Sequence, residues 1–511
     1  MSSILDIMFN MAIIKEFIRK IHAQQEKHKT WMDGLFLALC VLYILSGIPL
    51  VPFHGDESAY IILSEDYDRV FKKHEVEKVL FDPDGPKQYL RLSTGAILSF
   101  SIGFARDITN NEDPINKWLW GASWDENLAK GNLPAPSLLN VARFSSAIMG
   151  ALGTVLFFVL LRYLYPSRLV AWLATLAFVT QGSLLVSIRR AMQEGPKFLF
   201  LTLTTLLAFL IIQNLQTQKL RKALYFALGI ASGLTLAAKQ DTAPVLVALY
   251  LTIAFIPVWN RTSFRAVWHT LLYLFAATLL AYATFLAFMP VFWQWWESVF
   301  VLTGLSVALF QIPFIHETRS KVLASAGLAL VVVMTFVSPA LWGKLHIPLS
   351  SMAELRQSIV GSQVEVSNGQ DVLKADSAMG RLNFLLENTI SSKVMYMEVD
   401  SFNVPPMQAS IKAYEASFLS GRTGSFVFDG LIFLLVLLGM WFLLRNFNST
   451  SLLVYLLFFV TGTFLLVAIP LAWQRYFIIM QLPYMLFAGA GVYQLEMWLK
   501  PLILEKKTAS A

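Results

Sequence analysis

Residues 426–444 read FVFDGLIFLLVLLGMWFLL, a run in which Asp429 is the only charged side chain. A helix needs about 20 mainly apolar residues to cross the hydrocarbon core of a bilayer, so this run predicts a transmembrane helix. The rest of the chain has the same character, because 56% of its 511 residues are hydrophobic and 14% are charged. Soluble domains carry about 25% charged residues, so the composition excludes a soluble globular protein.

Eleven further stretches have a similar length and composition. Together the twelve predict an all-α polytopic membrane protein, a bundle of about 12 transmembrane helices. The single cysteine, Cys40, lies in the first stretch, so no disulfide can form within the chain. The predicted spans are 34–52, 143–162, 168–186, 197–213, 223–238, 243–259, 269–289, 293–312, 322–342, 426–444, 451–470 and 475–496.

Lys and Arg in short loops indicate which end of each span faces the cytosol, because cytosolic loops are enriched in these residues. The N-terminal segment and alternate loops after it are basic, which predicts that both termini are cytosolic. We therefore expect a multi-pass integral protein of the cell inner or plasma membrane. The basic residues on this side are Lys15, Arg19, Lys20, Lys27, Lys29, Arg162, Arg168, Lys219, Arg221, Lys222, Arg261, Arg265, Arg319, Lys321, Arg445, Lys500, Lys506 and Lys507.

Two long segments fall on the opposite, extracytoplasmic face, and loops of such length usually carry function. The first is 54–140; within it, 92–105 is apolar but short, which predicts an interfacial helix lying on the membrane. The second is a polar insert that precedes the last three spans. We therefore divide the chain into a transmembrane catalytic core with the first outer loop (1–342), the extracytoplasmic insert (343–425) and the C-terminal transmembrane helices (426–511).

Three outer loops contradict the charge rule, because they carry cations at the outer ends of helices. A cation beside hydrocarbon is unfavourable unless it has a partner. Two interpretations stay open: these side chains reach lipid headgroups, or they share an anionic ligand such as a phosphate at the membrane surface. The cations are Arg189, Arg190 and Lys197 in one loop, Lys239 in the second and Arg475 in the third.

Acidic side chains lie on the same predicted face. Asp56 and Glu57 follow the first span, after His54, and Glu194 begins the fourth. A carboxylate can be the base that deprotonates an attacking hydroxyl, while a sugar phosphate releases a stable anion that cations can stabilise. One catalytic carboxylate would then suffice, unlike the two of glycoside hydrolases. The alternative is that these acids only anchor loops through salt bridges.

Six short motifs carry a family resemblance, and all fall on the predicted outer face. In them the chain resembles the GT-C superfamily of glycosyltransferases, in the branch of the dolichyl-phosphate-mannose protein mannosyltransferases and the lipid A aminoarabinose transferases. Met289 departs from the Asn that is usual there. The motifs are Gly55-Asp56-Glu57 with Tyr60, Asn140-Val141-Ala142-Arg143, Arg189-Arg190-Ala191-Met192-Gln193-Glu194, Gly233-Leu234-Thr235-Leu236-Ala237-Ala238-Lys239, Phe288-Met289-Pro290 with Phe292-Trp293, and Trp473-Gln474-Arg475-Tyr476 with Pro483.

The resemblance implies an inverting transfer of a monosaccharide, hexosyl or pentosyl, from a polyprenyl- or dolichyl-phosphate carrier. The acceptor stays open among a lipid, a glycan and a protein. The resemblance also implies a role for each site residue. Asp56, Glu57 and Glu194 would form the catalytic group, in which Asp56 is the base, Glu57 orients the loop through Arg143 and Glu194 lines the same cavity. Arg189, Arg190, Lys239 and Arg475 would bind the donor phosphate, and Arg143, His54, Tyr60 and Tyr476 would orient the site. Asp56, Glu194, Lys239 and Arg475 must then converge within about 15 Å.

Metal binding is the less favoured interpretation of two other sequence features. Asp82-Pro83-Asp84 has an Asp-x-Asp spacing, but its Pro and Gly neighbours predict a surface turn. His54 could ligate a metal, although we expect it to be a hydrogen-bond partner. We predict no cofactor and no metal, with a divalent cation as the open alternative. The pair Glu65-Asp66 is expected to be solvated loop charge.

The expected partners are the lipid-linked donor, the acceptor and membrane lipids. The formal charge of +7 is attributed to loops at the lipid surface, so nucleic acid is not expected. Two other functions remain as alternatives: a transporter or flippase for a lipid-linked glycan, and an inactive relative that acts as a scaffold. A transporter usually carries ionisable groups near the middle of the bilayer, whereas here the charges lie at the ends of the spans.

Overall fold

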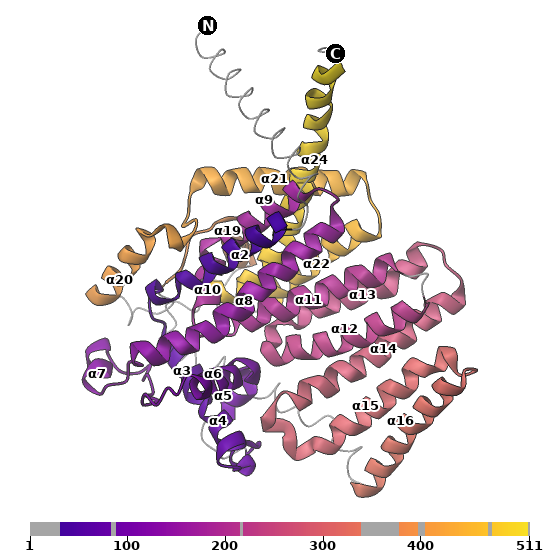
Figure 1. Cartoon of the computed structure of the whole chain (residues 1–511), viewed down its shortest axis with the longest axis horizontal. Helices are drawn as coiled ribbons and strands as arrows, with labels where there is room; N and C mark the ends of the chain where they lie inside the picture. Colours follow the sequence, from indigo (N-terminus) through magenta and orange to yellow (C-terminus); the bar gives the residue numbers. More distant parts are fainter. Residues whose placement is uncertain are drawn as a thin grey trace.

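The structure is a computed structural model that describes residues 31–82, 88–214, 218–338, 378–396, 404–468 and 473–508. Helices account for nearly all regular structure in these ranges, which contain no β-strand (Figure 1). The predicted all-α class is therefore confirmed. The basic N-terminal segment, part of the 343–425 insert and Asp84 lie outside the described residues.

Within the described ranges, ten of the predicted spans correspond to helices that are long and apolar enough to cross a membrane. Their starts follow local rules: Pro136 occupies the first turn of one helix, and the Ser263 side chain caps another by accepting a bond from the Ala266 amide. The helices are α2 (Trp31–Ser46), α8 (Pro136–Leu164), α11 (Glu194–Gln213), α13 (Ala243–Trp259), α14 (Phe264–Ala287), α15 (Trp296–Gln311), α16 (Thr318–Val337), α21 (Phe426–Arg445), α22 (Ser449–Ala468) and α24 (Gln481–Thr508).

The predicted span 168–186 is wrong as a single helix, because the structure divides it into α9 (Arg168–Val179) and α10 (Gly182–Arg189). The break is stabilised by a distant segment. The Arg422 amide donates to the Thr180 carbonyl at 2.7 Å, and the Gly182 amide donates to the Arg422 carbonyl at 3.0 Å. Backbone groups freed inside a membrane protein need such partners.

The predicted span 223–238 falls within α12 (Gln218–Ala238), which packs between α11 and α14. This helix is not among the ten long apolar ones, and its first two turns carry three cations. The expected total of about twelve spans therefore stays a prediction. The cations are Lys219, Arg221 and Lys222.

The first outer segment forms short helices that gather at one end of the long ones, at the left in Figure 1. The predicted interfacial helix 92–105 is two helices with a break at Thr94 and Gly95. A side chain at Gly95 would place its Cβ 2.1 Å from the Ala237 carbonyl oxygen, so glycine permits α6 to lie directly on the end of α12. The helices of this segment are α3 (Gly55–Leu63), α4 (Glu65–Tyr67), α5 (Gln88–Ser93), α6 (Ala96–Ile108) and α7 (Trp124–Ala129).

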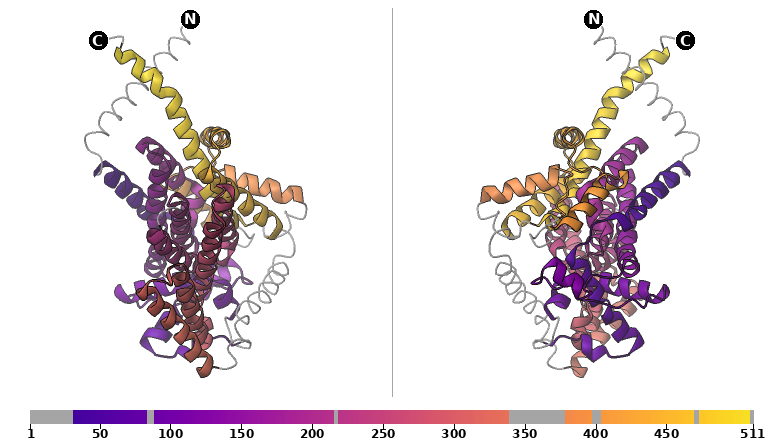
Figure 2. Two further views of the ribbon diagram at one scale, coloured as in Figure 1. Left: turned by 90° about the vertical axis from the view of Figure 1, so that its right-hand side faces the viewer. Right: turned by 90° about the vertical axis from the view of Figure 1, so that its left-hand side faces the viewer.

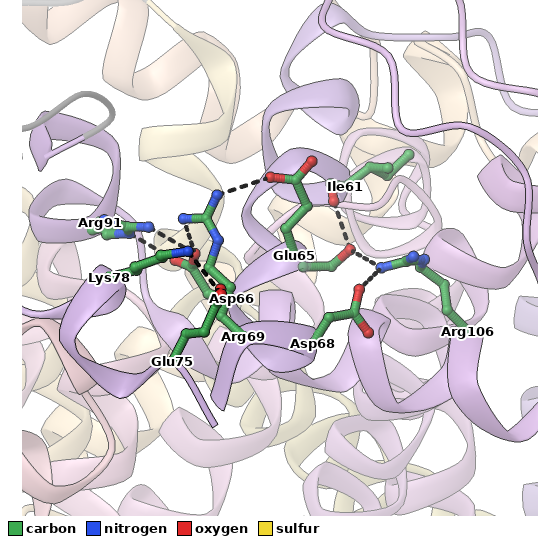
Figure 3. Close-up of polar contacts among 10 residues, drawn as sticks. Ile61, Glu65, Asp66, Asp68, Arg69, Glu75, Lys78, Arg91 and Arg106 are labelled. Atoms are coloured by element: carbon green, nitrogen blue, oxygen red, sulfur yellow. Dashed lines mark hydrogen bonds and ion pairs between the residues drawn. The ribbon is translucent and has the colours of Figure 1, made fainter. Parts of the chain in front are cut away.

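Ion pairs stabilise this segment internally (Figure 3). Two bonds of 2.7 Å join the Arg91 guanidinium to Asp66, and Arg106 pairs with Asp68 at 3.0 Å. Asp66 is buried, so its predicted role as solvated loop charge is wrong. These pairs fix the short helices to each other beside the ends of the spans.

The C-terminal helices pack tightly on the rest of the bundle. Helix α24 contacts α9, α21 and α22, and it extends beyond the other helices at its C-terminal end (Figure 2). It crosses α21 at two glycines, Gly439 and Gly491. A Cβ at Gly439 would lie 1.9 Å from the Phe487 carbonyl oxygen, and one at Gly491 would lie 1.9 Å from the Leu435 carbonyl oxygen. Small residues at such crossings let helix backbones approach closely in membranes.

We predict that Gly439→Val lowers the melting temperature of the purified protein, because the added side chain must separate α21 from α24. Overpacking of this kind typically costs about 1–3 kcal/mol. Gly430→Val on the same helix is the matched control, since no atom lies within 4 Å of a Cβ at that position. An equal loss of thermal stability in both variants would contradict the close crossing.

Candidate functional site

Helix α3 presents its two acids through a capping box at its first turn. The His54 Nδ1 atom accepts a bond from the Asp56 amide at 3.2 Å, and the Glu57 Oε2 atom accepts one from the His54 amide at 3.0 Å. Such reciprocal bonds fix the start of a helix. The side chains of Asp56 and Glu57 therefore leave α3 in defined and different directions.

Glu57 points into the protein and pairs with Arg143 of α8. The Arg143 Nε and Nη2 atoms donate to its two carboxylate oxygens at 2.8 and 2.9 Å, and the Ala191 amide adds a bond of 2.9 Å. Glu57 is 0% exposed. Burial raises the pKa of its carboxyl, but Arg143 and the hydrogen bonds outweigh burial and hold the pKa below its ordinary value.

Asp56 points the other way and forms an ion pair with Arg475 of the short helix α23 (Gln474–Phe477). The Arg475 guanidinium also lies 4.5 Å from the centre of the Trp473 ring. The Asp56 side chain retains 23% exposure. Burial raises the pKa of Asp56, but the charge of Arg475 and its hydrogen bond outweigh burial, so the pKa lies below its ordinary value.

Two more acids and two lysines continue this cluster. The Lys239 Nζ atom lies 2.5 Å from Glu194 Oε1 and 3.6 Å from Asp241 Oδ2. The Lys197 Nζ atom lies 3.1 Å from the same Asp241 oxygen and donates to the Arg475 carbonyl oxygen at 3.4 Å. A chain of contacts through Arg475, Lys197, Asp241 and Lys239 therefore connects Asp56 to Glu194.

Two tyrosines complete the surroundings of Lys239. Its Nζ atom lies 5.0 Å from the centre of the Tyr476 ring, in a cation–π contact. Burial raises the pKa of Tyr60, whose hydroxyl interacts electrostatically with Lys239, Asp56 and Glu194. Tyr60 is therefore a neutral neighbour of the charged cluster.

Arg189 does not join the cluster, although the sequence assigned it to the phosphate. Its Nε atom donates to the Ile44 carbonyl oxygen at 2.8 Å and its Nη1 atom to the Tyr414 hydroxyl at 2.9 Å. Its guanidinium also contacts the carbonyl oxygens of Tyr43 and Leu419, and the residue is 0% exposed. Since its hydrogen-bonding groups are used in this way, its assignment to the phosphate is corrected to a structural one.

Arg190 is also turned toward the backbone. Its Nε atom donates to the Pro52 carbonyl oxygen at 3.3 Å, and its Nη2 atom donates to the Tyr396 carbonyl oxygen at 3.4 Å. It is 4% exposed and lies close enough to Glu57 to lower the pKa of that carboxyl. Its placement supports the Glu57 pair and not the predicted contact with a phosphate.

Sequence reasoning missed two members of the cluster. Lys197 was noted as an outer cation without a role, and Asp241 was not singled out. The only available signal for Asp241 was its position two residues after Lys239. Among the described residues, this region holds five cations and four carboxylates. The cations are Arg143, Arg190, Lys197, Lys239 and Arg475, and the acids are Asp56, Glu57, Glu194 and Asp241.

The described part of the chain contains no group of three or more His, Cys, Asp or Glu side chains that could hold a metal ion. His54 Nδ1 is already used as a helix cap. Asp84 of the Asp-x-Asp sequence lies outside the described residues. The cations of the cluster are therefore the groups that could hold an anion at this site.

Comparison with known proteins supports the resemblance seen in the sequence. The family model for dolichyl-phosphate-mannose-protein mannosyltransferase matches residues 121–315, a range that contains Arg143, Glu194, Lys239 and Asp241. The match confirms the predicted resemblance to this branch of glycosyltransferases over that range. A comparison with curated proteins finds no match.

Three solved structures are similar at low sequence identity. The oligosaccharyltransferase AglB from Archaeoglobus fulgidus is 14% identical with a TM-score of 0.47, over 94% of this chain and 52% of its own. ArnT from Cupriavidus metallidurans is 13% identical with a TM-score of 0.33, over 93% and 80%. The protein O-mannosyltransferase complex Pmt1-Pmt2 of S. cerevisiae is 16% identical with a TM-score of 0.36, over 53% and 35%. This chain thus covers about a third of the length of the yeast chain and about half of the length of the archaeal one.

We predict that Glu57→Gln destabilises the protein by about 3–5 kcal/mol at neutral pH, because it leaves the Arg143 charge buried without its partner. The folded-state pKa of Glu57 lies below the ordinary value of about 4.3, so the ionised carboxylate stabilises the fold fully above that pH. The stabilisation is lost as the pH falls through the folded-state pKa. Thermal melts from about pH 7 to about pH 3 should therefore show a steeper decline for the wild type than for Glu57→Gln.

Glu112→Gln is the control for this experiment, since Glu112 is an exposed acid of the same outer segment. It should melt as the wild type does at every pH. A Glu57→Gln variant that matches the wild type at neutral pH would show that the buried pair contributes little.

Proposed function

We propose that this protein transfers a monosaccharide from a polyprenyl- or dolichyl-phosphate carrier to a hydroxyl group of a lipid, glycan or protein acceptor, with inversion at the anomeric carbon. The observation that carries the proposal is the contact between Asp56 and Arg475 within a cluster that also holds Lys239. A partly exposed carboxylate thus lies beside the cations that a departing phosphate needs. The family match over residues 121–315 supports the same reaction class.

The reaction follows from the chemistry of these groups. Asp56 accepts the proton of the acceptor hydroxyl, and the hydroxyl oxygen bonds to the anomeric carbon as the bond from that carbon to the phosphate oxygen breaks. The lipid phosphate leaves as an anion, which Lys239 and Arg475 stabilise without a general acid. Because one displacement inverts the anomeric carbon, a single catalytic carboxylate suffices.

Glu57 is assigned to positioning in place of the predicted catalytic role. Each of its two carboxylate oxygens accepts two hydrogen bonds, one from the Arg143 guanidinium and one from a backbone amide, either His54 or Ala191. A carboxylate with all of these bonds has no oxygen left to take a substrate proton. Its function is to hold α3 so that Asp56 faces Arg475.

The remaining charges also suit a lipid-linked phosphate. A phosphodiester donor carries one negative charge, which Lys239 and Arg475 can stabilise. Glu194 Oε2 is buried and has no hydrogen-bond partner among the described residues, so it can accept a bond from a sugar hydroxyl. We assign Glu194 to the wall of the donor site.

We place the site on the extracytoplasmic face of an inner or plasma membrane, with both termini in the cytosol. The proposal rests on the basic loops at the opposite ends of the spans and on the short helices α3 to α7 beside Asp56. The described part of the 343–425 insert would then lie on the acceptor side. Helix α20 (Pro405–Glu415) of this insert lies at the same end of the bundle as α7 (Figure 1).

The proposal predicts that Asp56→Asn abolishes sugar transfer. Purified protein in lipid would receive radiolabelled polyprenyl-phosphate monosaccharides and an extract of envelope lipids and proteins, and the label in the products would be measured. Loss of a general base typically slows a reaction by about 10²–10⁴-fold. Asp125→Asn, which changes an exposed acid of α7, should transfer at the wild-type rate.

The labelled product would identify the acceptor class. Equal rates of sugar transfer by Asp56→Asn and the wild type would show that the protein is a transferase but that Asp56 is not its base. An absence of transfer by folded wild-type protein from every donor would instead favour the transporter or scaffold alternatives.

A further inference from the structure

Lys197 and Asp241 form an ion pair that the reaction described above does not use. Lys197 lies in the first turn of α11, and Asp241 lies in the short 3-10 helix η4 (Gln240–Thr242) that follows α12. Their side chains are 0% and 8% exposed, with 3.1 Å between Nζ and Oδ2. Burying two charges is unfavourable unless each finds further partners, so the location of those partners is informative.

Each member of the pair contacts one of the two cations assigned to the donor phosphate. The Lys197 Nζ atom donates to the backbone carbonyl of Arg475 at 3.4 Å. The Asp241 Oδ2 atom lies 3.6 Å from the Nζ atom of Lys239. The pair thus connects two segments that are more than 200 residues apart in sequence and that carry the phosphate-binding side chains.

We propose that Lys197 and Asp241 are positioning residues, which hold Lys239 and Arg475 at the separation that the donor phosphate requires. This inference rests on the proposed function. Neither residue needs to touch the donor. Lys197 fixes the backbone from which the Arg475 guanidinium extends, and Asp241 fixes the end of the Lys239 side chain.

Lys239 shows why such positioning is needed. A lysine side chain has four rotatable bonds, so its ammonium group is poorly defined unless several partners hold it. Here Glu194 holds it at 2.5 Å, Asp241 at 3.6 Å and the Tyr476 ring at 5.0 Å. Without the Asp241 carboxylate, two buried lysines would share Glu194 as their nearest acid, and repulsion would move Lys239 away from its present position.

A simpler role for the pair is charge balance, and the two roles predict opposite effects of Asp241→Asn. This substitution removes a negative charge near the phosphate site, so charge balance alone predicts equal or tighter binding of an anion. Positioning predicts weaker binding despite the added positive charge, because Lys239 is displaced. The direction of the change therefore separates the two roles.

The test measures equilibrium binding of undecaprenyl phosphate to the full-length protein in lipid nanodiscs. We expect Asp241→Asn to weaken binding about tenfold, as loss of an orienting residue typically does. The double variant Lys197→Met/Asp241→Asn should bind undecaprenyl phosphate no more weakly than the single variant with the lower affinity, because the two residues act through one ion pair. Asp33→Asn is the matched control, since it breaks the Asp33–Arg168 ion pair, between α2 and α9, and should bind as the wild type does.

Binding by Asp241→Asn that equals or exceeds that of the wild type would overturn the positioning role. An equal loss in Asp33→Asn would also overturn it, because the loss would then be a general one. If Asp241→Asn does not fold, the double variant is measured in its place, since removal of both charges of a buried pair is tolerated better than removal of one. A double variant that binds undecaprenyl phosphate as tightly as the wild type does would overturn the positioning role. Wild-type protein that binds no polyprenyl phosphate would refute the proposed function, and the inference with it.

Discussion

The buried ion pair between Glu57 and Arg143 is the interaction on which the site depends. Taking two charges out of water is costly, and the cost is offset only when every polar atom finds a partner. Here the carboxylate oxygens also accept bonds from the His54 and Ala191 amides, and Arg143 also donates to the Ile48 carbonyl oxygen. One pair thus joins the end of the first span, helix α3, helix α8 and the turn before α11. Because Glu57 is fixed inward, its neighbour on α3 faces the opposite direction.

That neighbour, Asp56, meets Arg475 from the far end of the sequence, and the contact has a consequence for the reaction. The same guanidinium lowers the pKa of Asp56, the proposed base, and is assigned to the donor phosphate in the proposed function. A phosphate that engages Arg475 would compete with Asp56 for it and so raise the basicity of Asp56. The donor itself would then prepare the base for the acceptor, inside a cluster where Lys239 is already held by Glu194.

The sequence predicted those parts of the molecule that depend on local composition. Ten spans could be predicted from apolar length, and the grouping of Asp56, Glu194, Lys239 and Arg475 from charges at the outer ends of helices. Side-chain direction is not visible in this way. Arg189, next to Arg190 in the sequence, donates to backbone carbonyls outside the cluster. The break in the predicted span 168–186 is stabilised by Arg422, about 240 residues away in the sequence. The role of Asp66 was misjudged for the same reason, since its partner Arg91 comes from another helix.

In the proposed function, Lys239 and Arg475 receive the phosphate of a lipid carrier beside Asp56. An experimentally determined structure of the protein with undecaprenyl phosphate in lipid nanodiscs would show whether they do. We expect phosphate density in contact with both cations, with the Asp56 carboxylate released from Arg475 and the Glu57–Arg143 pair unchanged. Phosphate density at Arg189 and Arg190, or an Asp56–Arg475 pair that persists with the lipid bound elsewhere, would contradict it.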